Sequence, residues 1–315
     1  MLDNPVSLYD STRRMLESLE ANDNHFTKSN FSDIEHVQAR VLLCIYEFLQ
    51  TNPHRGWMSS GRCFRLLQLM RLHQIDTPEN VAKRNNDPDP ETWIRTEEKR
   101  RTFWIAYTLD RFISLLNEWP LMLDEHTICT RLPASEEDFR VGHGVEMPFL
   151  SEAMIAIDQT KTSPLTENFW DRHQWHDEML KARAATLCAM YPSVSQDADC
   201  MLLFANMILH TTILCLGKAM ESVQWQGDQY QDVVVAFKQR CLVAAKEIVN
   251  LSRSVVYISY FKVHPFTPLS LILCAEFFNS HRYLDESVET RIQEVHGVLR
   301  EMGSVNNLAQ NYFLA

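Results

Sequence analysis

The amino-acid sequence predicts an all-α protein, a single large domain in which helices pack in pairs. Apolar residues recur at helical spacing through most of the chain. Only 8 of the 315 residues are Gly, which argues against a sheet-rich fold built on tight turns. Length alone allows about two domains, but no linker rich in Gly, Ser or Pro divides the sequence. Hydrophobic residues make up 45% of the chain, enough for a sizeable core.

The first predicted helices follow from capping residues and prolines. Residues 1–30 are polar and weakly periodic, and we expect them to be partly disordered. Ser32 and Glu35 form a capping box, and apolar residues at helical spacing follow it. The stretch Pro53–Gly56 is expected to end this helix, and a second helix is predicted over residues 57–73.

The rest of the chain is also predicted to be helical, with two interruptions. Residues 77–89 are polar and are expected to form a loop. Pro90 occupies the favoured first position of a helix and is expected to open a long one. Residues 117–148 contain several Pro and Gly and are expected to be irregular. Further helices are predicted over residues 148–158, 169–190, 197–223, 228–253, 268–283 and 286–302.

The most informative segment is residues 97–111, which combine charged and aromatic side chains in one helix without Gly or Pro. The aromatic side chains favour a buried face, whereas an unpaired buried charge costs several kcal/mol. We therefore expect this helix to lie in a core that is crossed by ion pairs. The residues that form the pattern, in this helix and in the segment after it, are Glu97, Arg100, Arg101, Phe103, Trp104, Tyr107, Asp110, Arg111, Pro120, Ile128, Leu132 and Pro133.

This pattern resembles the regulatory region, or middle homology region, of the fungal binuclear zinc-cluster transcription factors. That family combines a helix of the form acidic–x–x–Arg-Arg–x–aromatic with a Gly-Arg-Pro turn and an Ile–x–x–x–Leu-Pro strip. Here Glu118-Trp119-Pro120 replaces the turn, so no role of the family's turn Arg is carried over. The resemblance covers the chain from Asp33 to Phe278.

The resemblance implies a transcription regulator in a fungus that controls a metabolic gene set and has no enzymatic activity. It implies action in the nucleus, with a share in the cytoplasm as an open alternative. The implied partners are the transcription machinery or another transcription factor, and a homodimer is a further alternative. The motif residues are expected to have structural roles. A ligand pocket between helices, lined by aromatic and Met residues, is another possibility that the sequence does not locate.

The cysteines do not form a zinc cluster. The family's DNA-binding module holds two zinc ions with six closely spaced cysteines, because thiolate ligands must converge at about 2.3 Å from the metal. We therefore expect no metal in this chain and no direct contact with nucleic acid, with zinc only in an upstream module. The scattered spacing and the lack of a signal peptide indicate free thiols in a reducing compartment. The eight cysteines are Cys44, Cys63, Cys129, Cys188, Cys200, Cys215, Cys241 and Cys274.

The charge balance also opposes DNA binding. The formal net charge is −11 and the pI is near 5.5, whereas DNA binding depends on neutralising phosphates with Lys and Arg. The tripeptide Lys99-Arg100-Arg101 has two interpretations. It is a basic patch or nuclear-import signal, or its charges pair with Glu97, Glu98 or Asp110, and the second interpretation is favoured because basic patches are usually longer.

Catalytic patterns are incomplete in this sequence. It has no G-x-S-x-G elbow and no Gly-rich phosphate loop. A terpene synthase would need clustered Asp residues on one helix to bind magnesium and diphosphate. Pro interrupts the Asp87–Asp89 stretch, and the acidic residues 136–138 lie outside the long helices.

Histidines give two weaker candidates. His173 and His176 would lie on one helix face beside Asp177 and Glu178, as a metal site requires, but a solvated helix face is the favoured interpretation. His210 lies in the most apolar stretch, residues 201–217, and is interpreted as a hydrogen-bonded core histidine. That stretch is shorter than the roughly 20 residues of a membrane span and is predicted to be a core helix.

Two hypotheses for the function follow. The favoured one is a fungal transcription regulator without its own zinc cluster, either a truncated gene product or a stand-alone protein that acts through partners. The alternative is a helical sensor or scaffold module that does not bind DNA and has no transcriptional role. Neither hypothesis involves a membrane.

Overall fold

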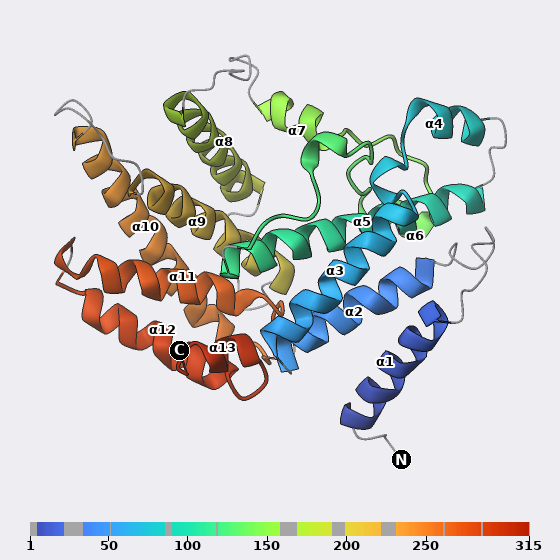
Figure 1. Ribbon diagram of the computed structural model, residues 1–315. Helices are drawn as coiled ribbons and strands as arrows, with labels where there is room; N and C mark the ends of the chain where they lie inside the picture. The colour runs from blue at the N-terminus through green and yellow to red at the C-terminus, as the bar shows by residue number, and fades with distance from the viewer. Residues whose placement is uncertain are drawn as a thin grey trace. The chain divides into compact units, whose positions relative to one another are not determined.

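The computed structural model describes helices and their connections but no strand within the part of the chain that it covers, which confirms the all-α prediction (Figure 1). The described residues are 5–21, 34–50, 52–85, 90–117, 119–157, 169–190, 199–221, 231–260, 262–284 and 286–314.

The chain divides into two compact units, residues 1–153 and 154–315. No linker marks the division, because it falls inside helix α7 (Leu150–Ile157). The other helices of the first unit are α1 (Pro5–Ala21), α2 (Ile34–Gln50), α3 (Pro53–Leu69), η1 (Leu72–Gln74), α4 (Pro78–Asn85), α5 (Pro90–Asn117), η2 (Glu125–Thr127) and α6 (Glu136–Val141). The second unit holds α8 (Phe169–Met190), α9 (Cys200–Glu221), α10 (Gln231–Val255), α11 (Thr267–Ser280), η4 (Arg282–Leu284), α12 (Val288–Met302) and α13 (Asn307–Asn311).

Helices α2 and α3 lie side by side in the first unit (Figure 1). The prediction that Pro53–Gly56 only ends α2 is wrong, because Pro53 is the first residue of α3. Asn52 caps this helix, and its side chain accepts a hydrogen bond from the His54 N–H at 2.8 Å. Gly56 lies inside α3, where a Cβ atom would meet the Phe48 ring of α2 at 2.7 Å. Gly is therefore required here by the close approach of two helices.

Two boundaries near α4 also differ from the prediction. α3 ends at Leu69 rather than at residue 73, and Arg71 then takes a left-handed conformation with φ of 54° before η1 begins. The predicted loop over residues 77–89 is wrong, since α4 occupies most of it. This short helix has Glu79 in its first turn and Lys83 and Arg84 in its last, an arrangement that suits the helix dipole. The predicted start of the long helix at Pro90 is confirmed.

Residues 5–21 form helix α1, which packs on α2, although the sequence here is polar and weakly periodic. Its Tyr9 and Leu16 are buried against Leu43 of α2. The Tyr9 hydroxyl donates a hydrogen bond of 2.7 Å to the carboxylate of Glu47, a fully buried residue of α2. Arg40 of α2, also buried, pairs with Glu20 of α1 at 2.6 Å. Helix α1 therefore supplies partners for two buried charges of α2.

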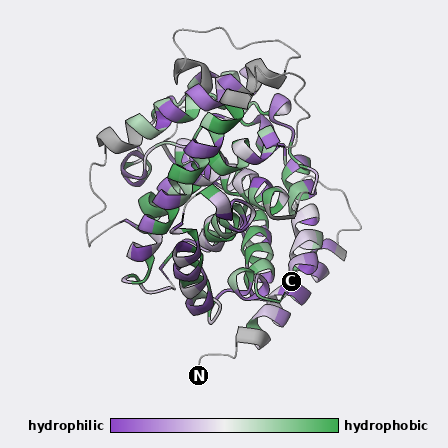
Figure 2. Ribbon diagram, turned by 90° about the vertical axis from the view of Figure 1, so that its left-hand side faces the viewer, coloured by the Kyte–Doolittle hydropathy of each residue, from purple (hydrophilic) through white to green (hydrophobic). Residues whose placement is uncertain are grey.

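In the second unit, α9 packs against α10 and α11, and α11 packs against α12. Hydrophobic faces of these helices form one core, whose members include Met207, Ile248, Leu271, Phe278 and Val295 (Figure 2). Within the described residues, α9 alone is long and apolar enough to cross a membrane by length and composition. Its contribution to this core agrees with the prediction of a core helix.

Replacing Tyr9 by Phe should lower the free energy of unfolding by about 1.5–3 kcal/mol, because the buried Glu47 carboxylate loses a donor. Urea unfolding measures this change. Tyr257→Phe is the control, since Tyr257 is 87% exposed and its substitution should change the free energy by less than about 0.5 kcal/mol. Equal effects of the two substitutions would contradict the role given to this hydrogen bond.

Candidate functional site: the motif helix and the strip it holds

Helix α5 carries the sequence motif. Residues 119–135 form an irregular segment beside it; this segment contains the Ile–x–x–x–Leu-Pro pattern, and we call the whole of it the strip. The irregular stretch was predicted over residues 117–148. Much of it is irregular, but it contains η2 and the helix α6, which Ser135 caps by accepting a hydrogen bond from the Asp138 N–H.

The main chain of the strip has few partners of its own, so its N–H and C=O groups need partners elsewhere. Two of them pair with main-chain groups in and beside η1. The main-chain N–H of Cys129 donates to the His73 carbonyl at 2.7 Å, and the main-chain N–H of Asp76 donates to the Cys129 carbonyl at 2.8 Å. Most of the other contacts come from α5.

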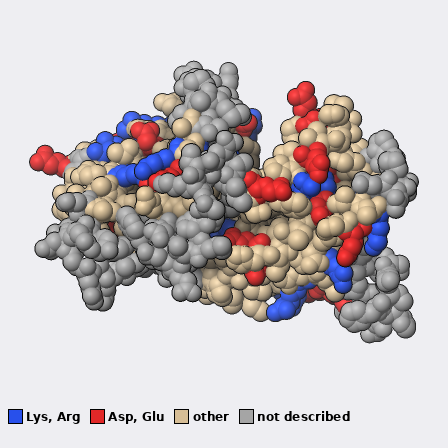
Figure 3. Space-filling view, turned by 90° about the horizontal axis from the view of Figure 1, so that it is seen from above, with Lys and Arg blue, Asp and Glu red and all other residues tan. Residues whose placement is uncertain are grey.

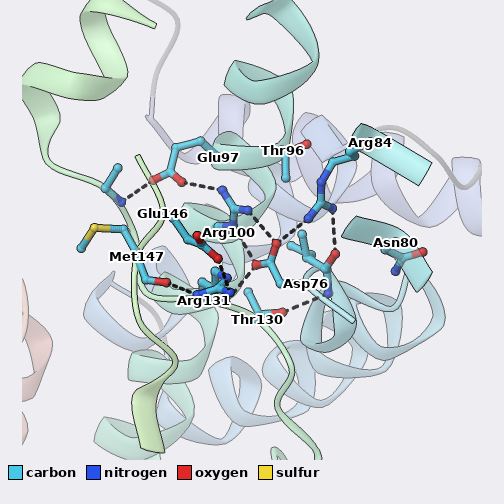
Figure 4. A network of polar contacts seen from close by, with 12 residues as sticks. Asp76, Asn80, Arg84, Thr96, Glu97, Arg100, Thr130, Arg131, Glu146 and Met147 are labelled. Carbon is cyan, nitrogen blue, oxygen red and sulfur yellow. Dashed lines mark hydrogen bonds and ion pairs between the residues drawn. The ribbon is translucent and has the colours of Figure 1, made fainter. Parts of the chain in front are cut away.

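Asp76 is the centre of a charge network (Figure 4). It follows η1, is 4% exposed, and faces arginines from two helices. Arg100 of α5 binds both carboxylate oxygens, with Nε–Oδ2 at 2.8 Å and Nη2–Oδ1 at 2.6 Å. Arg84 of α4 donates to Oδ1 at 2.6 Å. The main-chain N–H of Arg131 in the strip donates to Oδ2 at 3.0 Å, so one carboxylate joins α4, α5 and the strip.

Glu97 is a second buried carboxylate, one turn before Arg100 on α5. It accepts hydrogen bonds from Arg100 at 3.2 Å and from Arg101 at 3.3 Å. It also accepts the N–H of Ala134 in the strip at 2.8 Å. Arg101 continues outward to Glu136, with which it pairs at 2.6 Å, and its guanidinium donates to the Ala134 carbonyl at 3.1 Å. Glu97 and Arg101 thus bind the end of the strip.

Asp110 and Arg111 bind the beginning of the strip. The buried Asp110 carboxylate accepts the N–H groups of Met122 at 3.1 Å and of Leu123 at 3.0 Å. Arg111 pairs with Asp110 at 2.9 Å and donates to the Leu123 carbonyl, also at 2.9 Å. Its guanidinium lies 4.0 Å from the centre of the Tyr107 ring, a cation–π geometry. Arg111 is therefore held by a carboxylate, a carbonyl and an aromatic face together.

The aromatic residues fill the space between these two sets of charges. Phe103 is fully buried, and its ring meets the Trp104 ring edge-on with 5.2 Å between the ring centres. The Trp104 indole N–H donates to the Arg131 carbonyl at 2.6 Å. Burial raises the pKa of Tyr107, while the nearby Arg111 lowers it by a smaller amount. The aromatic part of the motif thus contributes packing and one further bond to the strip.

The remaining predicted residues lie at the edge of this arrangement. Pro120 is exposed, and Leu132 and Pro133 are half-buried. The Leu132 N–H donates to the Pro148 carbonyl at 2.9 Å. The structure therefore brings the residues of α5 together around the strip and leaves Pro120 outside this set of contacts.

Sequence reasoning missed Asp76, Arg84 and Arg131. Asp76 and Arg84 lie at the edge of, or inside, a stretch that was interpreted as a loop. Arg131 lies in the Ile–x–x–x–Leu-Pro pattern at a position that the pattern leaves unspecified. Its guanidinium pairs with Glu146 at 2.6 Å and donates to the Met147 carbonyl at 2.6 Å. Arg84 lies only 8 residues from Asp76, but the other two partners, Arg100 and Arg131, lie 24 and 55 residues away, so the network is not evident from the local sequence.

Each arginine of this network has a carboxylate partner. Arg84, Arg100, Arg101, Arg131 and Arg140 pair with Asp76, Glu97, Glu136 and Glu146. On the face shown in Figure 3, acidic and basic side chains of the described residues also lie close together. The contacts of Arg100 and Arg101 favour the ion-pair interpretation of Lys99-Arg100-Arg101. A network of this kind joins chain segments, and its arginines already have carboxylate partners.

Burial alone raises the pKa of Asp76. The hydrogen bonds from Arg100 and from the Arg131 N–H, with the charges of Arg100 and Arg84, outweigh burial and hold the pKa below its usual value. For Arg100, burial lowers the pKa, but Asp76 and Glu97 reverse the effect and raise it. Both groups are therefore charged at neutral pH, as the geometry of the pair requires.

Among the residues that the structure describes, the other candidates from the sequence form no metal site. The side chain of His173 lies outside the described residues, and Asp177 pairs with Lys181 at 2.8 Å and with Arg240. His210 is half-buried in α9, burial lowers its pKa, and its Nδ1 has no hydrogen-bond partner among the described residues. The interpretation of His210 as a hydrogen-bonded core residue therefore finds no support at Nδ1.

The described cysteines do not fit a zinc cluster. Among the residues that the structure describes, no group of three or more His, Cys, Asp or Glu side chains is placed to hold a metal ion. Burial raises the pKa of Cys63 to about 12, which opposes the thiolate form that zinc needs. The side chain of Cys188 lies outside the described residues.

Replacing Arg100 by Met should lower the free energy of unfolding by about 3–5 kcal/mol, because Asp76 and Glu97 lose their shared buried partner. Arg95→Met is the matched control on the same helix. Arg95 pairs with Glu91 at 2.6 Å, but its side chain is 71% exposed, so its loss should cost less than about 1 kcal/mol. Chemical unfolding of both variants checks the difference, and similar midpoints would refute the network's contribution.

The depressed pKa of Asp76 predicts acid sensitivity. A carboxyl whose pKa is lower in the folded than in the unfolded state stabilises the fold above the unfolded pKa of about 4, and loses this contribution as the pH falls further. The denaturant concentration at the unfolding midpoint of the wild type should therefore decrease as the pH is lowered below about 4. Asp76→Asn should be less stable at neutral pH and should lose less on acidification. A parallel pH profile for both proteins would contradict this assignment.

Comparison with known proteins supports the resemblance. The model of the fungal specific transcription factor domain matches residues 7–226. The pigment biosynthesis transcriptional activator pigB of Monascus ruber is 41% identical over 97% of this chain and 60% of its own length. The citrinin biosynthesis transcriptional activator ctnR of Monascus purpureus is 38% identical over 97% of this chain and 57% of its own length.

A third relative, the transcription factor tazR of Aspergillus terreus, is 37% identical over 96% of this chain and 51% of its own length. The chain therefore spans between half and three fifths of these curated relatives. No solved structure matches it. The prediction that a regulatory domain covers residues 31–315 stays a prediction, because the matched region begins and ends at other residues. The chain belongs to the family defined by the fungal specific transcription factor domain.

Proposed function

We propose that this chain is the regulatory region of a fungal transcription factor that controls a set of biosynthetic genes and acts in the nucleus. One observation carries this proposal: the similarity to two named biosynthesis activators extends over 97% of the chain. The relatives are named as transcription factors and not as enzymes. The net charge of −11 opposes binding to the phosphates of DNA.

The motif residues serve this function by holding the fold. Asp110 and Arg111 bind the beginning of the strip, and Glu97 and Arg101 bind its end. Phe103, Trp104 and Tyr107 fill the space between these contacts, while Pro120, Leu132 and Pro133 shape the strip itself. Contact with regulatory partners therefore falls to other surfaces. The partners are the transcription machinery or another transcription factor, and a second copy of the chain is a further candidate.

Deletion of the gene in the source organism tests the proposal. Transcripts of a linked biosynthetic gene set should change several-fold and should return when the gene is restored. A fluorescently tagged protein should concentrate in the nucleus. If deletion alters no transcripts and the tagged protein stays in the cytosol, the chain is a sensor or scaffold without a transcriptional role, and the proposal fails.

A tethering experiment tests the chain itself. Residues 1–315 are fused to an unrelated DNA-binding module upstream of a reporter gene. Reporter output should differ from that of the module alone, and Arg100→Met should weaken the effect more than Arg95→Met at equal protein levels. Output equal to that of the module alone would contradict a regulatory activity within these residues.

A further inference from the structure

The segment between Glu47 and Asp76 is basic, although the chain as a whole is acidic. Residues 48–75 contain four Arg and no Lys, Asp or Glu, so their formal charge is +4 within a chain of net charge −11. Helix α3 occupies most of this segment and carries three of these arginines, and the fourth follows it. All four are exposed, namely Arg55, Arg62, Arg65 and Arg71. The outward side of α3 therefore concentrates positive charge.

The rest of the chain uses these arginines little. Arg62 lies 3.9 Å from the carboxylate of Glu17, which already accepts a hydrogen bond from Arg13 at 2.9 Å. The Arg65 side chain has no hydrogen bond or ion pair with any residue that the structure describes. The buried Arg100 of α5, in contrast, contacts two carboxylates. Arg62 and Arg65 are therefore available to carboxylates from outside the chain.

Two large apolar side chains are exposed on the same side of α3. Met58 is 64% exposed and Leu69 is 54% exposed. Met58, Arg62, Arg65 and Leu69 follow one another at intervals of four, three and four residues, so they lie on one face of the helix. We call these four residues, together with Gly61 between them, the α3 face. It extends for about 16 Å at 1.5 Å per residue, with an apolar side chain at each end and two guanidinium groups between.

Gly61 leaves the middle of the α3 face open. A Cβ atom at this position would meet no atom within 4 Å, whereas at Gly56 it would meet the Phe48 ring. Gly weakens a helix interior relative to Ala, and no described neighbour requires it at position 61. A bare backbone allows another chain to approach closely. Gly61 is therefore accounted for by an occupant of this face.

The beginning of the strip borders the α3 face. The Trp119 ring lies 4.6 Å from the Trp57 ring, centre to centre. The Gln68 side chain donates to the Met122 carbonyl at 3.4 Å. Leu121 lies between these two contacts and is 52% exposed. The strip thus adds apolar surface along one side of the face.

We propose that the α3 face binds an acidic amphipathic helix of a partner protein. Apolar residues about three turns apart on that helix would contact Met58 and Leu69, and carboxylates between them would pair with Arg62 and Arg65. Docking of an apolar helix face is a common mode of peptide recognition, and complementary charges add specificity and speed of association. A nucleic acid would also pair with the arginines, but its phosphates would leave the exposed apolar side chains uncovered. The observations therefore favour a protein partner.

Fluorescence anisotropy with the full chain tests the chemistry of the partner. The probe is a labelled peptide of about 15 residues in which Leu recurs at i, i+4, i+7 and i+11 and Glu fills the flanking positions. It should bind at least about tenfold more tightly than the same peptide with Gln in place of Glu. Equal Kd values for the two peptides would overturn the role of charge. A labelled oligothymidine that binds as tightly as the acidic peptide, or more tightly, would overturn the choice of a protein partner.

A matched pair of charge reversals tests the location. Arg65→Glu should raise the Kd of the acidic peptide by about tenfold, because it places a carboxylate in the middle of the α3 face. Lys262→Glu makes the same change in net charge at an exposed residue of the second unit and should change the Kd less than about twofold. Equal effects of the two variants would overturn the site. If Arg65→Glu fails to fold by circular dichroism, Arg62→Glu, at a side chain that is 55% exposed, replaces it.

A second pair tests the close approach at Gly61. Gly61→Gln should raise the Kd of the acidic peptide by about fivefold without lowering the melting temperature, because Gln favours a helix more than Gly does. Gly297→Gln is the control, since a Cβ atom at Gly297 of α12 also meets no atom within 4 Å. An unchanged Kd for Gly61→Gln would overturn the docking of a helix on this face. These measurements need no transcriptional readout, so they stand or fall separately from the proposed function.

Discussion

The bidentate contact between Arg100 and Asp76 is the interaction on which the first unit depends. Asp76 follows η1, Arg100 lies in the first half of α5, and the same carboxylate also binds α4 and the strip. Two charges taken out of water are stable only when the geometry is good and the remaining donors and acceptors are satisfied. Asp76 meets this condition with four donors from three residues. Because all four donors must reach one carboxylate, these contacts fix α4, α5 and the strip relative to one another.

The two units are stabilised in different ways. In the first unit, buried charges recur at the contacts of α5 with its surroundings and of α1 with α2. In the second unit, the contacts between α9, α10, α11 and α12 are mainly apolar, and the charged groups gather at one end of a cavity. Ion pairs require a defined geometry, whereas apolar contacts adapt to small changes of shape.

The sequence predicted what depends on nearby residues. The helix over residues 169–190 and the start of α5 at Pro90 are correct, because helical periodicity and a proline at the first position are local signals. Pro53 was misinterpreted because the same residue that ends one helix also begins the next, and only the Asn52 cap distinguishes the two cases. The charged motif indicated buried ion pairs, but the choice of partners depends on the fold. The contacts of Asp76 with α5 and the strip join residues far apart in the chain, and the cavity of the second unit is lined by three different helices.

The contacts of the strip have a consequence for sequence variation. Asp110, Glu97 and the Trp104 indole bind main-chain atoms of the strip, while the side chains of Leu123, Thr130 and Ala134 are buried. Substitutions at Met122, Leu123 or Ala134 keep the bonded N–H groups, with proline as the one exception. The exposed side chains of this segment, such as those of Leu121 and Glu125, can therefore change without loss of these main-chain bonds. The strip is a place where one scaffold can carry different surfaces without losing its fold.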